Sequence, residues 1–195
     1  MKPITLILCV GALVLSTLGI QAEDVKNLLF NADFSQGNAQ QPANWVFSTW
    51  NLRDDSTATG KVDGKVITDA DGHRCLNIAS SEVLHAMQMW WQNQDAVCVG
   101  GGTYELTVSV KGTVKAGEAW PTIGVYFLDA AGKWIGIQKI DSNQGNSLPG
   151  DWQRVQGKVT APENAVKMGV RIGLVFADGQ AEIFYKDPVL VPTTK

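Results

Sequence analysis

MQMWWQN, residues 87–93, alternates two kinds of side chain over a length typical of one β-strand. In a strand, one face would carry Met87, Met89 and Trp91, and the other would carry Gln88, Trp90 and Gln92. Methionines fill hydrophobic cores well, so we expect the methionine face to be buried. The amide face suits a sugar, because the ring offers a stacking surface and the amides can meet hydroxyl groups. The alternative is a half-buried strand whose Trp90 is covered by a loop.

Short strands are also expected on both sides of this stretch. Turn-forming segments separate them, such as residues 69–72 (DADG) and 129–132 (DAAG). The expected strands cover residues 45–50, 65–68, 73–79, 104–111, 122–128, 133–140, 152–160, 165–176 and 181–191. A tight turn is expected at Asp178-Gly179, with the glycine at positive φ. No helical periodicity of comparable strength is present, which predicts an all-β fold, an antiparallel β-sandwich.

The first residues of the 195-residue chain have the pattern of a secretory signal peptide. Lys2 precedes an apolar run from Ile4 to Ile20, and Gln21-Ala22 follows. We expect residues 1–22 to be removed and residues 23–195 to form a single domain, secreted or periplasmic. No other apolar run is long enough to span a bilayer.

The net charge of the chain limits the classes of partner that it can bind. The formal net charge is −3, and it becomes −4 when Lys2 is lost with the signal peptide. Binding to nucleic acid or to an anionic membrane needs a clustered basic face, which this weakly acidic chain does not offer. We therefore expect no nucleic-acid partner and no binding to an anionic membrane. A monomer without a membrane span is expected as well.

Two cysteines, Cys75 and Cys98, follow the signal peptide. In an exported chain an even pair most simply forms a disulfide. Closing a loop of this length would stabilise the fold by roughly 3 kcal/mol in the chain-entropy model. A zinc site is the weaker interpretation, because two cysteines without neighbouring histidines do not complete a zinc shell.

Several segments together resemble carbohydrate-binding modules of families four and nine. They are NLLFNADFSQG (residues 27–37) followed by Pro42 and Trp45, GTYELTVSVK (102–111), DWQRV (151–155) followed by Ala161-Pro162, and the closing strand at 183–190. Their order matches that of the families over nearly the whole expected mature chain. The resemblance implies a two-sheet jelly roll whose concave sheet forms a sugar cleft. Trp45 and Trp152 stand where these families have a tryptophan, and we assign both to the core.

The resemblance also implies a structural calcium ion near the N-terminal turn and the closing strand. Asp33 and Asp187 are the carboxylates that match those positions, and carboxylate oxygen is the ligand that calcium prefers. Two departures weaken the expectation. Ser35 stands where the families often have Glu, and Lys186 replaces the first acid of the closing pair.

The candidate ligand-binding residues are aromatic and polar side chains that alternate with the core. They are Trp90, Gln88, Gln92, Arg171, Tyr126, Trp50 and Trp120. Arg171 lies opposite the apolar row of its strand, and so do Gly169 and Gly173, which would let a ligand approach the backbone. Sequence alone does not place Trp134.

These residues predict non-catalytic binding of a polysaccharide or oligosaccharide, held by aromatic stacking and by hydrogen bonds from amides and arginine. A secreted adhesion protein that uses the sandwich for protein contacts is the main alternative. A glycan-cleaving enzyme is less favoured, because it needs two carboxylates that face each other. The strand acids Glu105 and Glu182 have no evident partner, and His73 and His85 have no serine or cysteine nucleophile motif.

Overall fold

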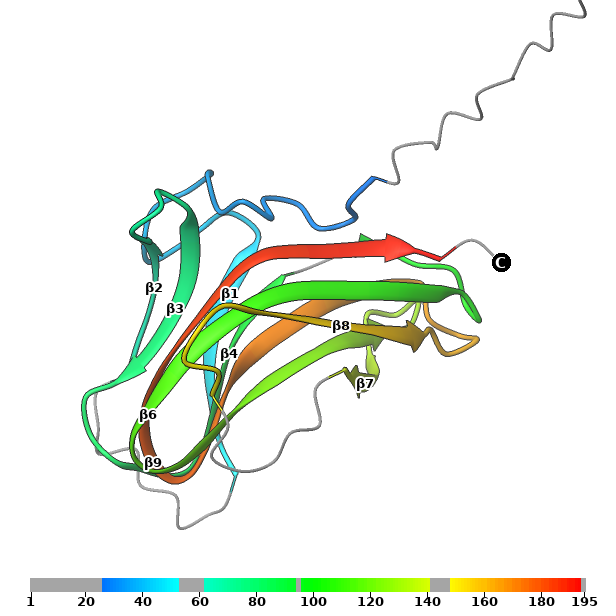
Figure 1. Cartoon of the computed structure of the whole chain (residues 1–195). Coiled ribbons are helices and arrows are strands. Elements are labelled where there is room, and N and C mark those ends of the chain that lie inside the picture. The colour runs from blue at the N-terminus through cyan, green and yellow to red at the C-terminus, as the bar shows by residue number, and fades with distance from the viewer. Residues whose placement is uncertain (1–25, 53–61, 94–95, 141–147, 194–195) are drawn as a thin grey trace, which may run out of the picture.

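A computed structural model describes residues 26–52, 62–93, 96–140 and 148–193 (Figure 1). The predicted signal peptide lies outside these ranges, within which no helix could cross a membrane. Within the described ranges nine strands form: β1 (Trp45–Asn51), β2 (Val62–Thr68), β3 (Arg74–Ser80), β4 (Leu84–Asn93), β5 (Ala96–Val97), β6 (Thr103–Leu128), β7 (Trp134–Lys139), β8 (Gln153–Thr160) and β9 (Lys167–Pro192).

The strands pair antiparallel in one sheet that curls into two layers (Figure 1). The first layer has the order β1-β4-β9-β6-β7 and uses the N-terminal half of β9 and the C-terminal half of β6. The second layer has the order β2-β3-β9-β6-β8 and uses the other halves of the two long strands. The short strand β5 pairs with the start of β9. The predicted all-β jelly-roll sandwich is therefore confirmed.

Two strands run through both layers without a break. β6 and β9 pair along their length, and Gly117 faces Gly179 where the pairing passes from one layer to the other. Both strands bend between the two layers (Figure 1). Gly117 has a φ of +61°, and the register shifts on both sides of it. A Cβ atom on either glycine would collide with the backbone of the facing strand. The predicted tight turn at Asp178-Gly179 was wrong, because the positive φ belongs to Gly117 and Gly179 continues β9.

The two predicted DxxG-type turns close hairpins as expected. Between β2 and β3, the carboxylate of Asp69 accepts hydrogen bonds from the backbone N–H groups of Asp71 and His73. Between β6 and β7, Asp129 caps its turn in the same way. Gly72 and Gly132 supply the positive φ, at +86° and +75°.

The core between the layers contains the methionine face of β4. Met87, Met89 and Trp91 are buried, as predicted. The indole N–H of Trp91 donates to the carbonyl of Asn77 at 3.2 Å, so this large ring leaves no unpaired donor in the core. Trp45 is also buried, which confirms its assignment, and its indole N–H donates to the carbonyl of Asn31 at 3.1 Å.

The core assignment of Trp152 was wrong. Trp152 directly precedes β8 and is only half-buried. Its ring lies under two ammonium groups, with the Nζ atom of Lys186 at 4.3 Å and that of Lys111 at 5.0 Å from the ring centre. A ring whose face attracts cations is stable at the edge of the solvent, so this tryptophan covers the second layer from outside.

Candidate functional site

The outward face of the first layer carries six of the seven predicted site residues in three rows that cross the strands, and Tyr126 lies in the next row with Gly169 and Ile137. Antiparallel partners point to the same side of a sheet, so each row shares this face. The rows are Val46–Gln92–Arg171–Gly124–Lys139, Ser48–Trp90–Gly173–Thr122 and Trp50–Gln88–Val175–Trp120. The pattern of β4 and β9 produces this arrangement, because their other residues fill the core.

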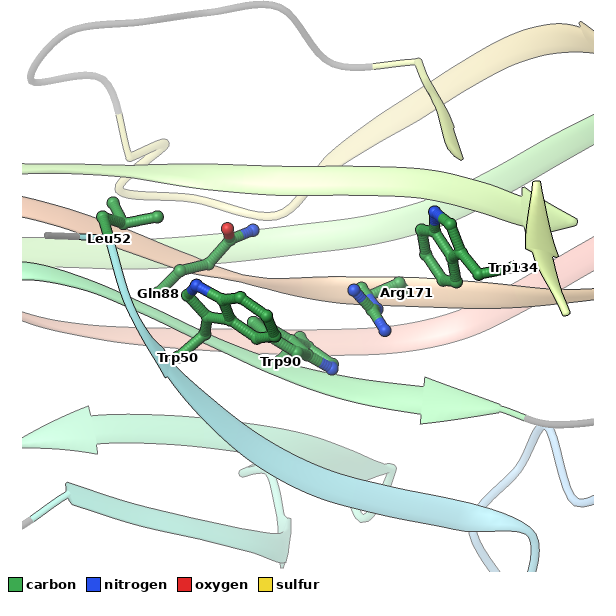
Figure 2. A pocket seen from close by; sticks show the side chains of 6 residues that line it. All are labelled: Trp50, Leu52, Gln88, Trp90, Trp134 and Arg171. Carbon is green, nitrogen blue, oxygen red and sulfur yellow. The ribbon is translucent and has the colours of Figure 1, made fainter. Parts of the chain in front are cut away.

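A pocket with a volume of about 410 Å³ opens on this face (Figure 2). Its walls are Trp50, Leu52, Gln88, Trp90, Trp134 and Arg171. Figure 2 shows Trp50 beside Trp90, and Arg171 between Trp90 and Trp134. The pocket thus combines three indole rings with one amide and one guanidinium, which is the composition that stacks on a sugar ring and bonds to its hydroxyls.

Arg171 is held in the middle of this pocket by neutral groups. Its Cζ atom lies 4.2 Å from the ring centre of Trp90 and 4.7 Å from that of Trp134. Its Nε and Nη2 atoms donate to Oε1 of Gln92 at 3.2 and 2.6 Å. Burial lowers the pKa of Arg171 below its ordinary value, yet a guanidinium stays charged at neutral pH. The pocket therefore contains a fixed positive charge.

The exposure of the rings differs from what strand parity alone suggests. Trp90 points into the pocket, but only 5% of its surface is exposed. Trp50 is 63% exposed and Trp134 is 41% exposed. The guanidinium of Arg171 lies over the ring of Trp90 (Figure 2), so Trp90 forms the floor. The rings that a ligand can reach are therefore those of Trp50 and Trp134.

Three predicted residues, Gln92, Tyr126 and Trp120, lie on the same face without forming the pocket wall. Tyr126 is 2% exposed and lies beneath Trp134, with ring centres 5.3 Å apart and ring planes at 8°. Its hydroxyl donates to the carbonyl of Asn93 at 3.0 Å, which fixes the ring. Trp120 is half-buried in the row of Trp50 and is not one of the six wall residues. Tyr126 can therefore act on a ligand only by supporting Trp134.

The glycines of β9 do not leave room for a ligand, contrary to the prediction. A Cβ atom on Gly169 would collide with the phenol ring of Tyr126. One on Gly173 would collide with Trp90 and with the carbonyl of Met89. The missing side chains therefore leave room for the phenol ring of Tyr126 and for the chain of β4 at Met89 and Trp90.

Sequence reasoning missed two of the pocket residues. Trp134 begins β7 and registers beside Leu128 across a bulge, which alternation along one strand does not reveal. Stacking on Tyr126 is the contact that places its ring over the pocket. Leu52 follows β1, outside the strands expected from the sequence, and its N–H donates to the carbonyl of Ala86 at 2.8 Å. Neither position carries a signal that is specific to a site.

The predicted disulfide between Cys75 and Cys98 is not formed, and both cysteines are buried free thiols. Cys75 belongs to β3 in the second layer, whereas Cys98 follows β5, which pairs with the first-layer half of β9. The thiol of Cys75 interacts with the carbonyl of His73 at 3.6 Å. Burial, and then the negative charge of Asp69, raises the pKa of Cys75 to about 11. The two thiols thus pack as small apolar groups in separate surroundings.

Of the two residues expected to hold calcium, Asp33 has protein partners of its own. Asp33 accepts hydrogen bonds from the backbone N–H and the hydroxyl of Ser35, and these bonds lower its pKa. Asp187 adopts a positive φ of 51°. Its neighbour Lys186 forms an ion pair with Asp69 at 3.0 Å. Across the described ranges, no three acidic, histidine or cysteine side chains gather as a metal site requires. The calcium ion therefore stays an expectation from the resemblance alone.

Neither a protein-family model nor a curated protein matches the sequence. Solved structures do share its fold. A CBM4 carbohydrate-binding module is 21% identical, with a TM-score of 0.51, over 85% of this chain and 99% of that one. The CBM22-1 xylan-binding domain of Xyn10C from Paenibacillus barcinonensis is 16% identical, with a TM-score of 0.55, over 88% of this chain and 97% of that one.

The same fold also occurs in proteins of other kinds. One match is the enzymatically active domain of tailspike protein 4 of bacteriophage CBA120, which is 13% identical with a TM-score of 0.57. The match covers 86% of this chain but only 21% of the tailspike chain. The Stig cyclase Fisc from Fischerella sp. TAU is 13% identical, with a TM-score of 0.56, over 87% of this chain and 98% of the cyclase. At these identities the likeness establishes fold and not activity. The protein is a jelly-roll β-sandwich of the type found in carbohydrate-binding modules, as the sequence resemblance predicted.

Proposed function

We propose that this protein binds a polysaccharide or oligosaccharide non-covalently in the Trp50–Trp134 pocket and catalyses no reaction. The observation that carries the proposal is the pairing of two exposed indole rings with an amide and a guanidinium in one pocket. The C–H faces of sugar rings stack on such indoles, and hydroxyl groups bond to such polar groups. The shared fold with carbohydrate-binding modules, one of them a xylan-binding domain, supports the same conclusion.

The side chains divide into those that contact the ligand and those that support them. In this proposal Trp50 and Trp134 stack on sugar rings, and Gln88 and Arg171 donate to hydroxyl oxygens. The others act indirectly: Trp90 forms the floor, Gln92 orients Arg171 and Tyr126 supports Trp134. We further propose that the protein acts as a secreted or periplasmic monomer after residues 1–22 are removed.

The composition of the pocket favours sugar binding over the two alternatives. An apolar patch with few amides would favour protein docking, whereas this pocket is a concave site that places Gln88 and Arg171 among its rings. A glycosidase needs a pair of carboxylates across the cleft. The six wall residues include no carboxylate, histidine, cysteine or hydroxyl side chain. The cyclase shows that the fold can support an enzyme, so this argument depends on the pocket and not on the fold.

Replacing either exposed ring should weaken binding while the fold is retained. A glycan array and affinity gels with soluble polysaccharides first identify a ligand for the unaltered protein. Trp50→Ala and Trp134→Ala should then each cost about 1 kcal/mol or more, about a fivefold loss of affinity in titration calorimetry. Phe30→Ala removes an exposed ring outside the pocket and should leave affinity unchanged. No binding in the array and gels, or unaltered affinity in both tryptophan variants, would contradict the proposal.

A further inference from the structure

All the charge in the three rows across the pocket face is positive. Of the residues that make up these rows, Arg171 and Lys139 alone are charged. Lys139 registers beside Gly124, which in turn registers beside Arg171, and it is exposed at the edge strand β7. The chain as a whole has a net charge of −3, so this local excess of positive charge runs against its overall balance.

The guanidinium of Arg171 has no counter-ion among the described residues. Its hydrogen bonds go to the neutral amide of Gln92, and it takes part in none of the ion pairs that the described residues form. The side chain is half-buried, and water therefore solvates it only in part. Keeping a partly desolvated charge without a partner costs free energy, which an anion in the pocket would recover.

The position of the neighbouring rings decides which part of the guanidinium a ligand can reach. Trp90 and Trp134 lie against it, at 4.2 and 4.7 Å from Cζ. The edge with Nε and one N–H of Nη2 is used by Gln92. Among the described residues, Nη1 makes no hydrogen bond, so the edge formed by Nη1 and the second N–H of Nη2 is the one that a ligand in the pocket could use. Two parallel N–H groups of this kind match a planar carboxylate in a bidentate pair.

We infer that the preferred ligand is an acidic saccharide, whose carboxylate binds the free edge of Arg171 while its neighbouring rings stack on Trp50 and Trp134. The inference rests on the proposed function, since it specifies the class of sugar that the same pocket takes. Lys139, in the same row as Arg171, adds a second positive charge to this face. The net charge of the protein is negative, so the protein as a whole does not attract polyanions. A preference for acidic saccharides would therefore have to come from the pocket.

Matched ligands test the inference on the unaltered protein. Acidic polysaccharides such as polygalacturonate, alginate and glucuronoxylan are compared with their carboxyl-reduced forms, in which CH₂OH replaces the carboxylate, and with neutral cellulose and xylan oligosaccharides. The acid form should bind at least about tenfold more tightly than its reduced form, as expected for a charge-assisted hydrogen bond. This advantage should shrink as NaCl is raised from 50 mM to 1 M, because salt screens the pair.

Variants locate the effect at Arg171. Arg171→Gln should remove the preference for the acid form, and Arg171→Lys should keep only part of it, because lysine keeps the charge but loses the fork. Lys158→Gln removes the same charge from β8 in the second layer and should have no effect. Circular dichroism melting checks that the variants fold.

The outcomes separate this inference from the proposed function. Equal or tighter binding of the reduced and neutral forms would overturn the acidic preference and leave saccharide binding standing. A preference for the acid form that persists in a folded Arg171→Gln variant would overturn the role of Arg171. Binding to no saccharide at all would contradict both.

Discussion

Replacing Trp91 by alanine should lower the free energy of unfolding by about 3–5 kcal/mol. Trp91 is fully buried between the two layers and packs against Phe47, with ring centres 5.2 Å apart. Removing the ring leaves a cavity and deprives the carbonyl of Asn77 of a hydrogen bond. Domains of this size have about 5–15 kcal/mol of stability, so the loss is a large fraction and should lower Tm by roughly 10 °C.

The same substitution at Trp50 is the matched control for Trp91→Ala. Trp50 is on the exposed face of β1, so Trp50→Ala should change the free energy of unfolding by less than about 1 kcal/mol. Urea unfolding of both variants measures the difference. If Trp91→Ala lowered the free energy of unfolding no more than Trp50→Ala does, the burial of Trp91 and the exposure of Trp50 would be wrongly assigned. The proposed site would then be misplaced.

Replacing Gly117 by alanine should cost about 3 kcal/mol of stability, which is large for the addition of one methyl group. Two effects combine at this position. Its φ of +61° disfavours any residue with a Cβ atom. The added Cβ would also collide with the carbonyl of Asp178 on β9, and both backbones are fixed by pairing. The long strands could not then bend from one layer into the other at their present register.

Gly72→Ala separates the two effects. Gly72 has a φ of +86° and no atom within 4 Å of an added Cβ, so it has the conformational cost without the collision. We expect a loss of about 1 kcal/mol there. Denaturant unfolding that gave equal losses for Gly72→Ala and Gly117→Ala would mean that the two strands do not approach each other closely at the bend.

Alternation predicted the sides of the strands well. Residues 87–93 have a period of two, and their methionine face is in the core with Trp91. The aspartate–glycine turns before β3 and β7 were equally readable, because their geometry is fixed by the residues themselves. These features depend on neighbours in sequence, and for this reason sequence was sufficient.

Features that depend on distant partners were not predictable. Parity indicated that Trp90 faces outward, but not that Arg171 of β9 covers its ring. Exposure of Trp134 depends on stacking with Tyr126 of another strand. β6 and β9 continue through the bend because Gly117 packs against Gly179. In the sequence alone, each of these glycines resembles a turn signal. In each case the deciding neighbour is far away along the chain.

The pairing of Cys75 with Cys98 was wrong for a related reason. Even count and expected export favour a disulfide, but they do not report where the strands place each thiol. β3 places Cys75 in the second layer, whereas Cys98 follows β5 at the first-layer half of β9. A composition argument cannot distinguish these surroundings from those of a bonded pair.

Titration of the tryptophan indole N–H signals in nuclear magnetic resonance spectra tests the central claim most directly. The protein has seven tryptophans, and each indole reports on its own surroundings. A saccharide selected by affinity gels should shift the signals of Trp50 and Trp134 most, and should leave those of Trp45 and Trp91, which are hydrogen-bonded in the core, unchanged. Unchanged Trp50 and Trp134 signals, with shifts at Trp152 on the second layer or at none of the seven, would contradict a saccharide site in this pocket.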